Sequence, residues 1–311
     1  MGRCVILPLM VTDIRNLVRR SLLVASALDE EALLKAAHCL ADSIVLDIAC
    51  RVPKPLRDNA RRRIPILLDD LSTSRAELLL WTDREGVVAD LGGCAPASFG
   101  GVLVTVDDPS EVRVIDTALS SWEQTHGMPD HTLNMELVIA SARGVNNAEK
   151  LAKTSRRNVA MALDETMLLR EQGLSTSDNP GKLHYHKGKV AMAASSAGLQ
   201  VHALENAGGA FIERAIAARH AGFRGLFCFN STDVAAINIG FHVSFREVQK
   251  AQRVLKTMDE AINKGRGAVA VSTGQMADLA NIRGALELIA WNDAVKNREA
   301  DVSNSTETIS I

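Results

Sequence analysis

Acidic side chains stand at the ends of two short apolar runs in this sequence. Asp47 ends the run Ser43–Asp47, and Asp164 and Glu165 follow another such run. A carboxylate at such a position can take a proton from a substrate or hold a cation. The structural alternatives are a loop-anchoring acid for Asp47 and first-turn acids of a helix over Thr166–Glu171. Both interpretations stay open, and we carry Asp47, Asp164 and Glu165 as catalytic candidates.

Three other polar side chains lie at or near the ends of further apolar runs. Thr105 and Ser141 are small hydroxyls that can bind a substrate oxygen or only satisfy backbone groups. His202 stands three residues before Glu205, and such a pair suits general base work near neutral pH. A packing or loop histidine is the structural alternative. We carry Thr105, Ser141 and His202 as substrate-binding candidates.

A basic run and the cysteines are the remaining groups that could bind or react. The run Lys182–Lys189 (KLHYHKGK) can attract an anionic substrate or the phosphates of a cofactor, and a solvated basic loop is the structural alternative. The five cysteines are scattered without a CxxC pair, which predicts neither a disulfide framework nor a zinc site. No GxSxG motif, P-loop or Cys–His arrangement indicates nucleophilic or phosphoryl chemistry.

Composition limits the class of ligand. The 311 residues are 47% hydrophobic and 23% charged, which is typical of a globular protein. A formal net charge of −2 and an aromatic content of 4% disfavour binding to nucleic acid or to a membrane surface. The short apolar stretch Cys4–Val11 lacks the cleavage site of a signal peptide, and no stretch approaches the ~20 apolar residues of a membrane span. We expect a cytoplasmic protein with a small-molecule ligand.

Eight short apolar runs alternate with helical patterns and place the candidate residues. The runs are Ser21–Ser26, Ser43–Asp47, Glu77–Trp81, Gly101–Val106, Leu137–Ala140, Val159–Leu163, Gln200–Ala203 and Gly225–Phe229. They lack strict alternation, as parallel strands buried on both faces do. Eight such strands with crossover helices predict an α/β fold, a TIM (β/α)₈ barrel, and no GxGxxG motif supports an open Rossmann sheet. Active sites of these barrels lie at the C-terminal ends of the strands.

The chain continues beyond the predicted barrel. Two amphipathic helical patterns, Ser244–Lys264 and Asp278–Val295, flank the Gly-rich stretch Gly265–Gly274. The first pattern carries an apolar stripe that must be buried on the barrel or on a neighbouring subunit, so we expect a homo-oligomer. The predicted divisions are an N-terminal extension (1–18), the barrel (19–240), a C-terminal helical extension (241–298) and a disordered tail (299–311).

Six motifs occur in order between about residue 19 and the C-terminal extension. They are Arg19–Leu23 (RRSLL), Ser43–Pro53 (SIVLDIACRVP), Val138–Asn147 (VIASARGVNN), Ala193–Leu199 (AASSAGL), Cys228–Asn238 (CFNSTDVAAIN) and Gly265–Asp278 (GRGAVAVSTGQMAD). Their order and spacing resemble the citrate lyase β-subunit-like family of the HpcH/HpaI aldolase superfamily, which includes malyl-CoA and citramalyl-CoA lyases.

The resemblance implies a TIM barrel that binds a CoA thioester and holds an oxo acid on a divalent metal for retro-aldol or Claisen-type cleavage. Such a cation would stabilise the enolate oxygen left when the carbon–carbon bond breaks. Arg20 and Asn230 lie in matching motifs and are further substrate-binding candidates. Asp278 matches a family Asp that reaches a neighbouring subunit's site in proton transfer, and a helix N-cap is the alternative. By the same resemblance, the homo-oligomer is expected to be a trimer or a multiple of it.

The sequence departs from the family pattern at the metal ligands. In an ungapped alignment the family's metal-binding Glu falls on Ala140 and its metal-binding Asp on Met167, and neither side chain can hold magnesium. The acidic pair after the second strand becomes Ala49 and Cys50, and the substrate-binding Arg of the third strand corresponds to Trp81 or a neighbour. We therefore expect no magnesium at the usual site, while a CoA thioester remains a candidate ligand.

The retained acids and the lost metal ligands leave two functions open. The first is a divergent carbon–carbon lyase or aldolase that acts on a small acid or an acyl-CoA thioester without the family's magnesium site. The alternative is a non-catalytic barrel, a pseudoenzyme, that binds a thioester or acid or assembles with an active homologue. The retained acids Asp47, Asp164 and Asp278 favour the enzyme, whereas Ala140 and Met167 favour loss of activity.

Overall fold

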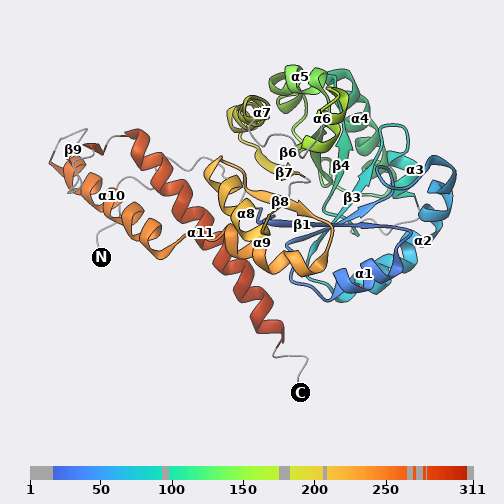
Figure 1. The fold of residues 1–311 in the computed structure, drawn as a ribbon, viewed down its shortest axis with the longest axis horizontal. Helices are drawn as coiled ribbons and strands as arrows, with labels where there is room; N and C mark the ends of the chain where they lie inside the picture. Colours follow the sequence, from blue (N-terminus) through green and yellow to red (C-terminus); the bar gives the residue numbers. More distant parts are fainter. Residues whose placement is uncertain are drawn as a thin grey trace. The chain divides into compact units, whose positions relative to one another are not determined.

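The computed structural model describes residues 17–92, 98–174, 183–205, 209–264, 269–270, 276–277 and 279–306. The chain divides into two compact units (Figure 1). One is the barrel unit, Arg19–Phe241, and the other joins Met1–Val18 with His242–Ile311. The barrel unit therefore ends one residue after the predicted boundary.

Eight parallel strands close into a barrel in the order β1 to β8, which confirms the predicted TIM fold. The ring is completed where β1 pairs with β8, Ser21 opposite Leu226. The strands are β1 Ser21–Ser26, β2 Ser43–Asp47, β3 Glu77–Thr82, β4 Gly101–Thr105, β5 Asn134–Ile139, β6 Asn158–Asp164, β7 Gln200–Leu204 and β8 Gly225–Cys228. Each strand overlaps one of the eight predicted apolar runs, because a strand covered on both faces is apolar along most of its length.

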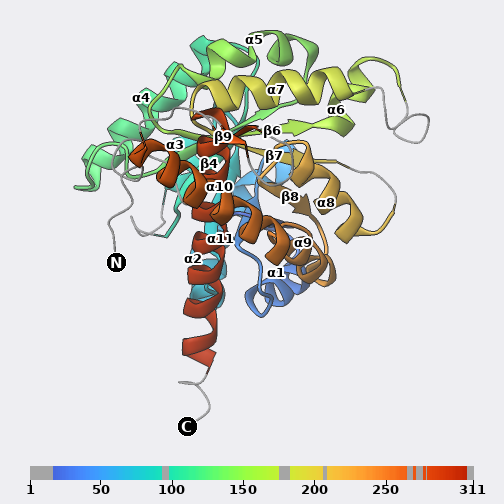
Figure 2. The same ribbon diagram turned by 90° about the vertical axis from the view of Figure 1, so that its left-hand side faces the viewer.

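Helices follow the strands and surround the barrel (Figures 1 and 2). They are α1 Glu30–Ala37, α2 Arg57–Asp70, α3 Val87–Leu91, α4 Pro109–Thr125, α5 Ala142–Ala152, α6 Glu165–Glu171, α7 His184–Ser196, α8 Phe211–His220 and α9 Val234–Gly240. Short 3₁₀ turns also occur, η2 Lys54–Leu56, η3 Leu71–Thr73 and η4 Ser231–Asp233. Side-chain caps fix several helix starts. Asp108 and Glu111, for example, form a capping box at α4.

Two apolar layers hold the barrel together. The larger layer packs the outward faces of the strands against the helices, and includes Ile44, Leu80 and Leu151. The smaller layer fills the barrel interior with side chains such as Val45 and Phe227. The interior layer makes this barrel a packed core rather than a pore, so a ligand must bind at an end of it.

The second unit contains a helical pair and a short hairpin. Helix α10, Phe245–Asn263, packs along α11, Leu279–Thr306, through a cluster around Met258 and Ile282 (Figure 2). The strands β9, Val269–Ala270, and β10, Met276–Ala277, pair antiparallel.

The tail predicted from residue 299 overlaps the end of helix α11. Helix α11 continues to Thr306. Once a helix has started, each further residue adds a hydrogen bond at low cost, so a polar end can extend a long helix despite weak helix propensity. No helix among the described residues is long and apolar enough to cross a membrane.

Candidate active site

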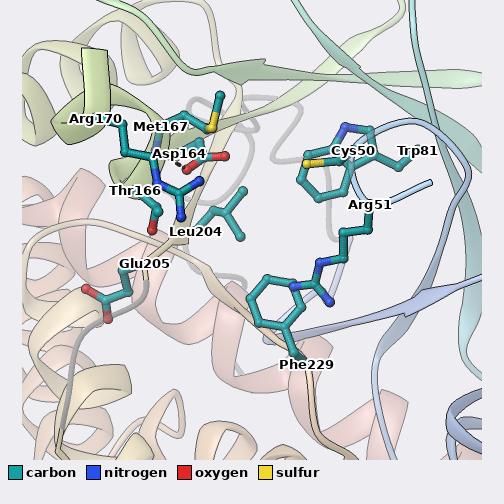
Figure 3. Close-up of a pocket in the computed structure, with 10 residues that line it drawn as sticks. All are labelled: Cys50, Arg51, Trp81, Asp164, Thr166, Met167, Arg170, Leu204, Glu205 and Phe229. Carbon is teal, nitrogen blue, oxygen red and sulfur yellow. Dashed lines mark hydrogen bonds between the residues drawn. The ribbon is translucent and has the colours of Figure 1, made fainter. Parts of the chain in front are cut away.

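A pocket of about 420 Å³ opens at the C-terminal ends of the barrel strands (Figure 3). Its walls come from the ends of β2, β3, β6, β7 and β8 and from α6. The lining residues are Cys50, Arg51, Trp81, Asp164, Thr166, Met167, Arg170, Leu204, Glu205 and Phe229. This end of a TIM barrel is where catalytic residues gather, because loops from many strands meet there. The volume lies in the range of small-molecule sites.

Two guanidinium groups face this pocket from different walls. Arg51 follows β2 and stacks on the ring of Phe229, with its Cζ 3.5 Å from the ring centroid. Arg170 projects from α6 on the side of Asp164 and Thr166 (Figure 3). In the part of the chain that the structure describes, neither guanidinium has an ion pair or hydrogen bond. Guanidinium groups recognise carboxylates through paired hydrogen bonds, so the pocket offers two donors for an anion.

Asp164 is the predicted catalytic residue that the structure brings into the pocket. It ends β6, is 7% exposed, and its Oδ1 accepts a hydrogen bond of 2.9 Å from the backbone N–H of Met167. Burial raises its pKa above the ordinary value of 3.8, while hydrogen bonds from the backbone of Met167 and Thr166 and the charges of Arg170 and Arg51 lower it. A carboxylate with a raised pKa is a stronger base, which suits proton transfer.

Glu165 points into a neighbouring chain of charges rather than into the pocket. Its carboxylate lies 2.7 Å from Nζ of Lys187, which also lies 3.5 Å from the carboxylate of Glu205. Glu205 in turn pairs with Arg214 at 3.1 Å. Burial raises the pKa of Glu165 to about 7 although the ammonium group of Lys187 lowers it. Glu205 lines the pocket, so this chain of charges supports the pocket wall from behind.

Asp47 adopts the structural role that the sequence left open. Its carboxylate is buried and accepts hydrogen bonds from the backbone N–H groups of Ala49, Cys50 and Arg51, at 3.0, 2.8 and 3.0 Å. Burial raises the pKa of Asp47, and these three hydrogen bonds lower it. Asp47 therefore fixes the loop that presents Arg51 to the pocket, and it is a positioning residue here.

The hydroxyl candidates lie at the same end of the barrel but outside the lining of the pocket. Thr105 ends β4 with an exposed side chain. Ser141 caps α5, accepts a hydrogen bond of 2.9 Å from the N–H of Gly144 and donates one to Asp107. Asn230 caps η4 and lines a separate cavity of about 220 Å³ beside α1. These three side chains are thus near the mouth without meeting one another in the pocket.

Arg20 and His202 lie away from the mouth, and their prediction as substrate-binding residues is corrected. Arg20 precedes β1 and forms a buried ion pair of 2.8 Å with Asp42. His202 points into the barrel, where its Nδ1 lies 2.7 Å from the carboxylate of Glu136. The carboxylate of Glu136 also lies 3.4 Å from Arg19, at the N-terminal end of the strands. Because His202 lies against Glu136 in the barrel interior, the expected His202–Glu205 pair does not form.

The basic run is helical rather than a loop, over the part that the structure describes. Helix α7 begins at His184, and Lys187 is one of its first residues. Lys187 is bound to Glu165 and Glu205, so it is not a free cation for CoA phosphates. Asp278 lies outside the described residues, and its predicted role stays a prediction.

Sequence reasoning missed the two arginines of the pocket. The sequence does hold a local sign that Arg51 could reach the pocket, because Arg51 lies in the loop after a predicted strand that ends in Asp47. Arg170 lies four residues after Thr166, which places both on one face of α6. Neither position shares a motif with the other, and only the closed barrel brings Arg51 and Arg170 to the same cavity.

The described side-chain oxygens at the C-terminal ends of the strands do not fit a magnesium site. Magnesium prefers near-octahedral oxygen ligands, commonly from one or two carboxylates with water. One oxygen of Asp164 is engaged by a backbone N–H, Glu165 is bound to Lys187, and Ala140, after β5, has no donor. In the residues that the structure covers, no three His, Cys, Asp or Glu side chains gather as metal ligands would.

The fold is a closed eight-stranded TIM barrel with a charged pocket at the C-terminal ends of its strands. TIM-barrel enzymes have their active sites at this end. Residues 20–231 match the model of the HpcH/HpaI aldolase/citrate lyase family, and the chain belongs to this family of lyases and aldolases. The correspondence covers most of the barrel unit.

Two relatives and one solved structure show how far the similarity extends. The citrate lyase subunit beta of Leuconostoc mesenteroides subsp. cremoris is 25% identical over 246 residues, 76% of this chain and 81% of that protein. The L-malyl-CoA/beta-methylmalyl-CoA lyase of Cereibacter sphaeroides is 29% identical over 277 residues, 80% of this chain and 86% of that protein. The structure of the protein CitE of Mycobacterium tuberculosis, in complex with magnesium, acetoacetate and coenzyme A, superposes with a TM-score of 0.68. It is 18% identical and covers 89% of this chain and 99% of that one.

Proposed function

We propose that this protein is a carbon–carbon lyase or aldolase that cleaves a small hydroxy acid, or its acyl-CoA thioester, without magnesium at the family's usual site. The observation that carries the proposal is the arrangement of Arg51 and Arg170 around Asp164 in one pocket. The two cations can bind an anionic substrate and stabilise developing negative charge, and the buried carboxylate can act as the base.

The base would act on the hydroxyl group of the bound substrate. For a 4-hydroxy-2-oxo acid, the carboxylate of Asp164 takes the hydroxyl proton, and the hydroxyl-bearing carbon becomes a carbonyl as the C3–C4 bond breaks. The electron pair of that bond stays on C3 as an enolate, and C3 then receives a proton to give the second product. The raised pKa of Asp164 makes its carboxylate a stronger base for removal of the hydroxyl proton. The carboxyl group, once protonated, can donate that proton to C3.

The enolate oxygen needs a positive partner at the moment the bond breaks. Arg51 and Arg170 are the described cations that face the pocket and are not already paired with a carboxylate. A guanidinium that is held in place, as Arg51 is by Phe229 and by the loop fixed on Asp47, stabilises developing charge without reorganisation. In the family, magnesium supplies this Lewis-acid role when bound, and the donors described here do not fit it.

The alternative is a non-catalytic barrel that binds an acid or thioester, or assembles with an active homologue. Ala140 favours it, because a methyl group stands where the resemblance puts a metal-binding carboxylate. Asp47 favours it too, since its carboxylate is fully engaged with backbone N–H groups. The pocket remains able to bind an acid under either proposal.

Cleavage in the presence of a chelator separates the two proposals. The full chain would be incubated in EDTA with 4-hydroxy-2-oxo acids and with the CoA thioesters of malate, citramalate and citrate, and the products followed by NMR. We expect chelator-resistant cleavage of at least one hydroxy acid, reduced by about 10²-fold or more in Asp164→Asn and in Arg170→Gln. We expect the three thioesters to be cleaved far below the ~10 s⁻¹ of an ordinary enzyme.

Two results would contradict the lyase proposal. Cleavage that disappears in EDTA and returns with magnesium would restore the metal-dependent chemistry. Stoichiometric binding of these acids with no product from any of them would support the non-catalytic barrel. Glu213→Gln, an exposed substitution on α8 outside the pocket, is the matched control and should behave as the unaltered protein.

A further inference from the structure

Thr166 is the lining residue of the pocket that carries a hydroxyl group, and the proposed cleavage does not yet use it. It stands two residues after Asp164, in the first turn of α6, and is partly buried. Arg170 follows one turn later on the same face of the helix. Figure 3 shows the three side chains on one wall of the pocket. A ligand that meets the proposed base and this cation therefore also meets the hydroxyl group of Thr166.

The hydroxyl group of Thr166 forms no hydrogen bond among the residues that the structure describes. Threonines further along a helix or just after one behave differently. Thr117, Thr125 and Thr154 donate to the carbonyl oxygen four residues earlier, at 2.9, 2.8 and 2.6 Å. For Thr166 the residue four positions earlier is Ala162, which belongs to β6. Because this contact needs a preceding helical turn, the Thr166 hydroxyl stays free to bind a ligand.

The backbone at the start of α6 fixes Thr166 relative to Asp164. Asp164 is the N-cap of this helix, and its carboxylate accepts a hydrogen bond of 2.9 Å from the backbone N–H of Met167. The carboxylate and the Thr166 hydroxyl thus belong to one rigid turn. A hydroxyl group on a ligand has one proton to donate and two lone pairs that accept. Such a group can donate to the carboxylate of Asp164 and accept from the hydroxyl of Thr166 at the same time.

We propose that Thr166 is a specificity-determining residue that recognises the hydroxyl group of the substrate. Its hydroxyl donates a hydrogen bond to the substrate's hydroxyl oxygen, while Asp164 accepts the proton of the same group. In the proposed cleavage that oxygen gains negative charge as its proton leaves, and a donor that is already in place stabilises such charge. The inference rests on the proposed function for its site, and it identifies the residue that distinguishes a hydroxy acid from the same acid without the hydroxyl group.

Equilibrium binding tests the inference without any turnover. The ligands are 4-hydroxypentanoate and pentanoate, which carry the same charge and differ by one hydroxyl group. Neither has the 2-oxo group that the proposed cleavage needs, so both bind without being consumed. Each is titrated into the full chain by calorimetry in EDTA. We expect 4-hydroxypentanoate to bind about fivefold more tightly than pentanoate, as one net hydrogen bond would give.

Substitutions of threonine locate the effect. Thr166→Val keeps the shape of the side chain without its hydroxyl group, and should weaken 4-hydroxypentanoate about fivefold while changing pentanoate by less than about twofold. Thr166→Ala removes the same hydroxyl group and should lose the same preference, which covers a valine variant that fails to fold. Thr166→Ser keeps the hydroxyl group and should retain most of the preference. Thr117→Val, at an exposed position on α4, is the matched control, with no change expected.

The outcomes also separate this inference from the proposed cleavage. Equal binding of the two acids by the unaltered protein, or binding of neither at millimolar concentration, would overturn the inference. A preference that Thr166→Val leaves intact would overturn it as well, because another group would then recognise the hydroxyl. A preference that depends on Thr166, with no cleavage of any hydroxy acid, would sustain the inference and remove the lyase proposal. Cleavage of a hydroxy acid together with equal binding would do the reverse.

Discussion

The ammonium group of Lys187 lies 2.7 Å from the carboxylate of Glu165, yet burial still raises the pKa of that carboxyl to about 7. The two residues come from consecutive helices of the barrel unit, α7 and α6, and their pair stands behind the wall that Glu205 contributes to the pocket. A carboxyl that changes charge near neutral pH makes this wall sensitive to pH.

This shift predicts how stability depends on pH. Between the ordinary pKa of 4.5 and about 7, the folded protein holds a proton on Glu165 that the unfolded chain has lost. Unfolding therefore releases a proton, and this group lowers the free energy of unfolding as pH rises through that window. The full effect is on the order of 3 kcal/mol, reached above pH 7.

Glu165→Gln removes the titration. We expect the variant to gain stability relative to the unaltered protein as pH rises from 5 to 8, measured by urea unfolding at both values. Glu213→Gln, exposed on α8, should follow the unaltered protein. A stability difference between Glu165→Gln and the unaltered protein that is the same at pH 5 and pH 8 would contradict the raised pKa.

Asp47 should be needed for stability more than for chemistry. Asp47→Ala leaves the N–H groups of Ala49, Cys50 and Arg51 without their acceptor, and we expect it to lower the free energy of unfolding by about 2 kcal/mol. Denaturant unfolding measures this directly. Asp69→Ala, at the exposed end of α2, is the control.

The positioning role of Asp47 has a second signature. Because Asp47 fixes the loop that carries Arg51, and Arg51 is proposed both to bind the acid and to stabilise the enolate, Asp47→Ala should raise the KM and lower kcat together, as Arg51→Gln should. A folded Asp47→Ala variant that keeps both values would show that Arg51 does not depend on Asp47 for its position.

Magnesium binding at the mouth is the next prediction. The engaged oxygen of Asp164, the Glu165–Lys187 ion pair and the methyl group of Ala140 leave too few free oxygen ligands, so we expect no stoichiometric binding. Isothermal titration of the full chain with magnesium chloride measures it. Binding with a stoichiometry of one that Asp164→Ala abolishes would show that the loop after β6 rebuilds a ligand set.

The barrel could be predicted from the sequence because one physical signal repeats eight times. A strand buried on both faces is apolar along most of its length, and each of the eight runs overlaps its strand, with bounds that differ by three residues at most. The strand-end acids followed from the same runs, since barrel sites lie at those ends. Asp47 and Asp164 were both found this way, although their different roles depend on which backbone N–H groups reach them.

The pocket itself could not be predicted from local patterns. Arg51 and Arg170 are separated by more than a hundred residues and are brought together only by closure of the ring. His202 was misplaced because a strand residue three positions before a loop acid can face the barrel interior instead of the mouth. Its partner, Glu136, lies on β5, and a sequence gives no local sign of such a pair.

The last prediction concerns assembly through the C-terminal extension. Helix α10 buries Ala251, Met258 and Ala261, while Phe245 at its first turn is 75% exposed. Helix α11 covers the part of the stripe around Met258, so Phe245 is a part of it that stays available to another subunit. We therefore propose that the protein forms a homo-oligomer, a trimer or a multiple of it by the resemblance, with the region from Phe241 onward at the interface.

Light scattering on the full chain at micromolar concentration measures the assembly. Phe245→Asp should shift it toward the monomer, and Arg253→Gln, exposed on the same helix, should leave it unchanged. A full chain that is monomeric under these conditions would remove the interface and, with it, the idea that Asp278 serves a neighbouring subunit.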